Sequence, residues 1–104
     1  MPLTHDFKQT VRARAARDQA FRRALLREAV ELIISGDLQT GKAVLRDYVN
    51  ATVGFPNLEA RTDIPTKSLM RMLSPKGSPS AKNLTVIMAA LQKSEGVSFR
   101  LAKR

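Results

Sequence analysis

The sequence predicts an all-α fold of five to six helices, with a repressor-like helix-turn-helix and a short C-terminal β-strand. Apolar residues recur at three- and four-residue spacing through most of the chain, which is typical of helices with one buried face. Gly, Pro, Asp and Ser cluster between these runs, where helices end and begin. The 104 residues predict a single domain, 1–104. It divides into N-terminal helices (1–36), a helix-turn-helix core (37–95) and a C-terminal strand and tail (96–104).

The N-terminal part predicts two helices. Residues 4–16 form the first, because Phe7, Val11 and Ala15 recur every four residues and Thr4 or Asp6 can cap the start. The second begins after Asp18 and ends before Gly36. Its apolar stripe is wide enough to be buried on more than one side. We expect three arginines to lie on the remaining surface of this helix: Arg22, Arg23 and Arg27.

A third helix follows the sequence SGD at 35–37. Gly36 suits the left-handed position after a helix, and Asp37 suits the cap of the next one. The helix runs to about Thr52, before Gly54 breaks the pattern. Gly41 lies in its first turn, where the missing side chain would let another helix approach closely.

Two short helices and one long helix complete the core. Pro56 suits the first turn of a helix over 56–62, DIP at 63–65 forms a tight turn, and a second short helix spans 66–73. Ser80 caps the last helix, which ends at Gly96. The methionines at 70, 72 and 88 are interpreted as core filler. The alternating run VSFRL (97–101) predicts a strand, which needs a partner and would most simply pair with its twin in a dimer.

Charge and composition narrow the function. Lys and Arg total 18 against 9 Asp and Glu, a formal net charge of +9, which favours a polyanionic partner. There is no cysteine, and the single histidine, His5, lies near the chain start, so we expect no metal site, no cofactor and no catalytic residues. The sequence contains no run of about 20 apolar residues, so the expectation is a cytoplasmic protein that does not contact membranes.

The segment 56–73 has the proportions of a helix-turn-helix. Apolar residues of both helices and of the turn are expected to pack inward: Leu58, Ile64, Leu69 and Met72. The outward face of the second helix then holds Lys67, Ser68 and Arg71, because residues three and four apart share a face. Arginine and lysine can donate hydrogen bonds to guanine O6 and N7, so these three residues are the predicted base-reading set.

Phosphate contacts are expected around the start of the second short helix and around the start of the last helix. The predicted phosphate-contacting residues are Thr66, Lys76, Ser78, Ser80, Lys82 and Asn83. Hydroxyl, amide and ammonium groups of this kind would fix the register of the protein on DNA without reading its sequence.

Most of the chain also resembles a known family. ALLREAVELIISGDLQTGKAVLRDYVNATVGF, followed by RTDIPTKSLMRML and GSPSAKNL, is similar to the probable addiction-module antidote proteins, which are HigA-like antitoxins related to phage repressors. The resemblance implies an antitoxin of a type II toxin–antitoxin module. Such a protein neutralises a small RelE/ParE-superfamily toxin by direct binding and, as a homodimer on operator DNA, represses its own operon.

Two positions depart from the family pattern, which usually has a small residue where this chain has Glu59 and a glycine where it has Asp63. Asp63 tolerates a left-handed backbone. Glu59 would need to swing outward or to pair with Arg61 or Lys67, and near DNA it would repel phosphate. The alternative is therefore a toxin-binding or other protein-interaction module with weakened or lost DNA binding. A non-specific RNA binder is less favoured, because few aromatic residues are available for stacking.

Overall fold

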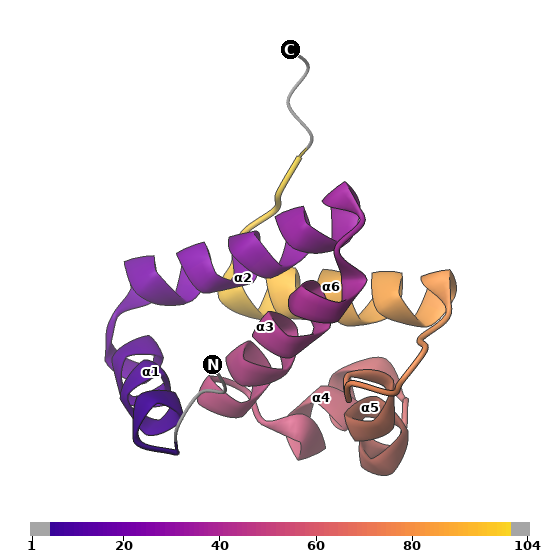
Figure 1. The fold of residues 1–104 in the computed structure, drawn as a ribbon, viewed down its shortest axis with the longest axis horizontal. Helices are drawn as coiled ribbons and strands as arrows, with labels where there is room; N and C mark the ends of the chain where they lie inside the picture. The colour runs from indigo at the N-terminus through magenta and orange to yellow at the C-terminus, as the bar shows by residue number, and fades with distance from the viewer. Residues whose placement is uncertain (1–4, 101–104) are drawn as a thin grey trace.

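The protein consists of six helices packed around one core, as a computed structural model of residues 5–100 shows (Figure 1). Side chains are described from residue 9 onward, so the predicted cap Thr4, the side chain of Phe7 and residue Leu101 lie outside the described part. The helices are α1 (His5–Arg17), α2 (Gln19–Ser35), α3 (Leu38–Ala51), α4 (Phe55–Thr62), α5 (Thr66–Met72) and α6 (Ala81–Glu95). The predicted all-α fold is confirmed.

Side-chain caps start three of the helices at the predicted residues. Each cap oxygen accepts a hydrogen bond from a backbone N–H in the first turn, which would otherwise lack a partner. The pairs are Asp18 with Phe21 at 3.0 Å, Asp37 with Thr40 at 3.2 Å, and Ser80 with Asn83 at 3.1 Å. Gly36 ends α2 in the left-handed conformation, with φ at 102°, as predicted.

The closest helix–helix contact joins α2 and α3 at Gly41. A Cβ atom built there would lie 2.5 Å from Cγ1 of Ile33 and 3.3 Å from the backbone oxygen of Ala29. Any larger residue would therefore force the two helices apart, which confirms the predicted role of Gly41. The core extends from this contact through every helix from α2 to α6, and its fully buried members include Leu26, Leu45, Leu58, Leu69, Leu73, Ile87 and Leu91.

The end of α6 is tied to α2 and α3 by a buried carboxylate, Glu95, whose side chain is 5% exposed. Its Oε1 accepts hydrogen bonds from Nε of Arg22, at 2.8 Å, and from the hydroxyl of Tyr48. Arg23 donates to the backbone oxygen of Glu95 at 3.2 Å. The expectation that Arg22 and Arg23 only decorate the surface is therefore wrong, because both are half-buried and hold α6 in place.

The same contacts change how these groups titrate. Burial raises the pKa of Glu95, but the hydrogen bonds from Arg22 and Tyr48 outweigh it and hold that pKa below its usual value. Burial, followed by the hydrogen bond to Glu95, raises the pKa of Tyr48 well above its usual value. At neutral pH the carboxylate is thus charged and the phenol protonated, which is the arrangement that the hydrogen bonds require.

The predicted C-terminal strand is not present in the part of the chain that the structure describes. Residues 97–100 follow Gly96 as an extended segment without a ladder partner. The backbone N–H of Val97 donates to the backbone oxygen of Gln92 at 3.0 Å, and that of Phe99 donates to the side-chain oxygen of Gln92 at 2.9 Å. One edge of the segment is therefore bonded to α6, in place of a neighbouring strand. Val97 and Phe99 still pack inward, as the alternation predicts.

None of the described helices is both long enough and apolar enough to cross a membrane.

The junction at Glu95 generates a prediction about stability and pH. Glu95→Gln should lower the free energy of unfolding at pH 7 by about 2 kcal/mol, because a buried, charge-assisted hydrogen-bond acceptor is lost. Because its pKa is lower in the folded chain than in the unfolded one, the wild-type carboxylate stabilises the fold above about pH 5. That contribution is lost as the pH falls through the lowered pKa of the folded chain. The variant should therefore lose less stability than the wild type over this interval.

Urea unfolding at a series of pH values measures the difference. Glu28→Gln is the matched control, since Glu28 is exposed and makes no ion pair within the described residues. Parallel pH profiles for wild type and Glu95→Gln would contradict the assignment.

Candidate nucleic-acid interface

Helices α4 and α5 are two short helices joined by the turn 63–65 at one end of the molecule (Figure 1), which is the element order that the helix-turn-helix prediction requires. Asp63 ends α4 in the left-handed conformation, with φ at 60°, so the aspartate takes the position usual for glycine. Leu58 and Leu69 are fully buried, and Ile64 packs against the same core. The inward-facing side of the motif is as the sequence predicts.

The start of α5 is held by Glu59 of α4. Pro65 precedes the helix and provides no side-chain cap. Instead, Oε1 of Glu59 accepts hydrogen bonds from the backbone N–H and the hydroxyl of Thr66, both at 2.7 Å. These bonds, the hydroxyl bond first, lower the pKa of Glu59. Glu59 thus acts as a cap from the neighbouring helix. Of the two expected alternatives, its side chain is exposed and so points outward, and its partner is Thr66 in place of Arg61 or Lys67.

The other end of α5 is held by three side chains on one face of α3. Lys42, only 2% exposed, donates from Nζ to the backbone oxygens of Ser74 at 3.0 Å and Gly77 at 2.6 Å. Arg46 donates to the backbone oxygen of Leu73 at 3.2 Å. Gln39 adds a bond to the backbone oxygen of Pro75. Cations are favourable at this end because helix carbonyls there lack intrahelical partners.

Gly77 lets the following loop fold tightly over the end of α5. A Cβ atom built on Gly77 would lie 2.0 Å from the backbone oxygen of Arg71 and 2.6 Å from that of Met72. No side chain fits there, so the loop lies directly against the end of α5. This contact fixes the distance between the end of α5 and the loop that leads to α6.

The outward face of α5 is open to solvent. Lys67 and Arg71 are exposed, and Ser68 is half-buried. The six predicted phosphate-contacting residues lie on α5, the loop and the start of α6: Lys76, Ser78, Ser80 and Lys82 are exposed, and Thr66 and Asn83 are half-buried. Two hydroxyls in this set already have partners, because Thr66 donates to Glu59 and Ser80 accepts from Asn83. The base-contact and phosphate-contact assignments stay predictions.

Met70 differs from the expectation for the methionines. Met72 and Met88 pack against the core, but the side of α5 that carries Met70 leaves it 52% exposed. It is one of two exposed large apolar residues in the described part of the chain. It lies three residues from Lys67 and next to Arg71, on the face that the sequence assigns to DNA.

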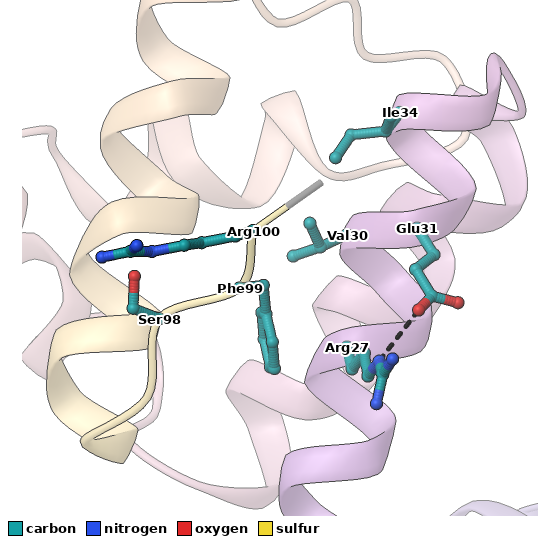
Figure 2. A pocket seen from close by; sticks show the side chains of 7 residues that line it. All are labelled: Arg27, Val30, Glu31, Ile34, Ser98, Phe99 and Arg100. Atoms are coloured by element: carbon teal, nitrogen blue, oxygen red, sulfur yellow. Dashed lines mark hydrogen bonds and ion pairs between the residues drawn. The ribbon is translucent and has the colours of Figure 1, made fainter. Parts of the chain in front are cut away.

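A second surface feature is a groove of about 300 Å³ between α2 and the C-terminal segment. Figure 2 shows Val30 and Ile34 of α2 opposite Phe99, with the ion pair of Arg27 and Glu31 at the rim. Ile34 is 54% exposed here. Along this side of the segment, the backbone N–H groups of residues 98 and 100 have no partner within residues 5–100.

Metal chemistry has no candidate site among the described side chains, where no three His, Asp or Glu residues are close enough together to hold an ion.

The buried lysine generates a prediction about the motif. Lys42→Met keeps the length of the side chain but leaves the oxygens of the loop without their donor, so the free energy of unfolding should fall by about 3 kcal/mol. Amide hydrogen exchange should accelerate most over residues 73–79, because these residues lose their attachment to α3.

Lys82→Met is the matched control, because Lys82 is exposed and makes no ion pair in the described part of the chain. Equal exchange rates over 73–79 in the two variants would contradict a holding role for Lys42.

Comparison of the chain with protein-family models, with curated proteins and with solved structures gives no significant match.

Proposed function

We propose that this protein is a cytoplasmic DNA-binding antitoxin that represses its own operon as a dimer and neutralises a RelE/ParE-superfamily toxin by direct binding. The observation that carries the DNA-binding part is the exposed cationic face of α5, held by Glu59 at one end and by Lys42 at the other. A helix mounted in this way keeps its outward side chains in a fixed register, as base reading requires. The antitoxin part comes from the resemblance of the motifs.

The charge distribution supports an anionic partner for this face. Lys67 and Arg71 make no ion pair with the described residues, whereas Arg22 and Arg23 are paired with Glu95. Free cations on a rigid helix can donate to guanine or to phosphate, and bound counterions would be released on association. The carboxylate of Glu59, at the start of α5, is engaged by Thr66.

The dimer is proposed to form through the C-terminal segment. Its inner edge is bonded to Gln92, while the N–H groups of residues 98 and 100 are free within the described chain. An unpaired extended edge is a template for another strand. A second copy presents the same edge, so antiparallel pairing satisfies both at once. The partner strand would also cover Ile34, which lines the groove beside this edge. Two α5 helices could then engage half-sites about 34–36 Å apart.

DNA reading is tested at Arg71. Arg71→Ala should cost about 1–3 kcal/mol on the selected operator sequence and relax specificity at one base position. Lys82→Ala is the comparison, because loss of a phosphate contact should weaken all sequences alike and reduce the salt dependence by about one charge. Gel-shift titrations at several salt concentrations separate the two. Unchanged operator affinity for Arg71→Ala would remove Arg71 from the reading set.

The dimer is tested at Ser98. Ser98→Pro removes one N–H from the free edge, so it should abolish strand pairing and leave the monomer folded. Ser98→Ala keeps that N–H and serves as the control. Sedimentation equilibrium should find dimers for the wild type and Ser98→Ala, and monomers for Ser98→Pro. If Ser98→Pro remained dimeric, the interface would lie elsewhere.

The alternative, a toxin-binding module with weakened or lost DNA binding, predicts a different experimental result. Glu59 and Asp63 motivated it, and the geometry accommodates both without disturbing the motif. Co-purification with a toxin from an adjacent gene, without any shift of upstream DNA, would select this alternative.

A further inference from the structure

We infer that Met70 reads the methyl group of a thymine in the major groove, next to the bases contacted by Lys67 and Arg71. This inference rests on the proposed DNA binding and adds to it a residue and a base. It starts from an observation that composition and spacing did not predict: a methionine with 52% of its surface exposed on the outward face of α5.

The exposure of Met70 follows from the shape of the motif. Leu69 and Leu73 are fully buried and fix the inward face of α5, while Met72 packs against the same core. Met70 lies about 100° around the helix from Leu69, so its side chain cannot reach the core without turning the helix. Because Glu59 and Lys42 hold the two ends, that rotation is blocked. The thioether is therefore presented to whatever binds this face.

The surroundings of Met70 favour DNA over a protein surface. Its neighbours on the face, Lys67 and Arg71, are both exposed cations. Ile34, the other exposed large apolar residue of the described chain, lies on α2 beside the groove and not on α5. Met70 lies at one side of the cationic face, about 60° around α5 from Lys67 and about 100° from Arg71. The major groove offers a matching surface, because a thymine methyl there is an isolated apolar group among hydrogen-bonding edges.

The flexibility of methionine suits this contact. An unbranched, polarisable side chain can adapt its end to a methyl group without a fixed hydrogen-bond geometry. One methyl buried against it should change affinity by about fourfold, from the transfer free energy of a single methylene-sized group. That is smaller than the effect of a bidentate arginine, so Met70 would refine a site that Arg71 and Lys67 define.

The experiment begins with selection of preferred duplexes by the full-length protein. Each thymine of the selected site is then replaced by deoxyuridine, which removes the 5-methyl group and keeps base pairing. Wild-type protein should lose about fourfold in affinity at one thymine per half-site. Met70→Ala should bind the thymine site more weakly and show no further loss on the uracil duplex. Glu28→Ala is the control: it truncates an exposed side chain of α2 that lies outside both α5 and the groove beside the C-terminal segment, so it should keep the full uracil penalty.

The outcomes separate this inference from the function beneath it. Selection of no sequence, with no duplex bound, would overturn both. Sequence-specific binding without a uracil penalty, or with a penalty that Met70→Ala retains, would overturn only the assignment of Met70. A retained penalty together with loss of toxin co-purification in Met70→Ala would assign the side chain to a protein interface instead. Circular dichroism establishes that the variants are folded before binding is compared.

Discussion

The arrangement depends on how a seven-residue helix is held in place. Helix α5 has too few intrahelical hydrogen bonds to be stable alone, since helices shorter than about 12 residues are marginal in water. Leu69 and Leu73 bury one side of it, but burial alone does not fix the ends. Glu59 provides an acceptor at the first turn, and Lys42 and Arg46 provide donors to the backbone oxygens that directly follow the last turn. Each charged group lies at the end whose partial charge it complements.

Some of the basic residues hold the fold together, and others are exposed to solvent. Lys42, Arg46, Arg22 and Arg23 donate to buried or half-buried oxygens and hold the helices together. Their hydrogen-bond donors are therefore largely occupied within the molecule. The high net charge therefore overstates how much positive surface is available. Four exposed basic residues lie on α5, the loop and the start of α6, and further exposed ones lie on other helices and on the C-terminal segment.

Local signals predicted the helices well, and long-range contacts explain what was missed. Caps such as Asp18 and Asp37 act within one turn, so their residue type and position suffice to predict them. Lys42 and Glu95 bond to partners 32 or more residues away, and nothing in their immediate sequence distinguishes them from surface charges. The exposure of Met70 depends on the rotation of a helix with barely two turns, which apolar spacing leaves ambiguous. The strand prediction had the correct alternation of inward and outward side chains. No strand forms in the described chain, because Gln92 bonds one edge of the segment and the other edge could pair only with a second chain.

Glu59 shows how a departure from a sequence pattern can be structural and still shape function. Its carboxylate occupies the backbone N–H and the hydroxyl of Thr66 at the start of α5. A phosphate cannot use those two donors while the bond persists, and the negative charge there would repel it. The start of α6 differs: Ser80 caps it with a neutral hydroxyl, and Lys82 is exposed beside it. In the proposed complex with DNA, backbone contacts would therefore concentrate at α6 and the preceding loop. The proposal then has α5 enter the groove with Lys67, Met70 and Arg71, because its own first turn needs no phosphate to neutralise it.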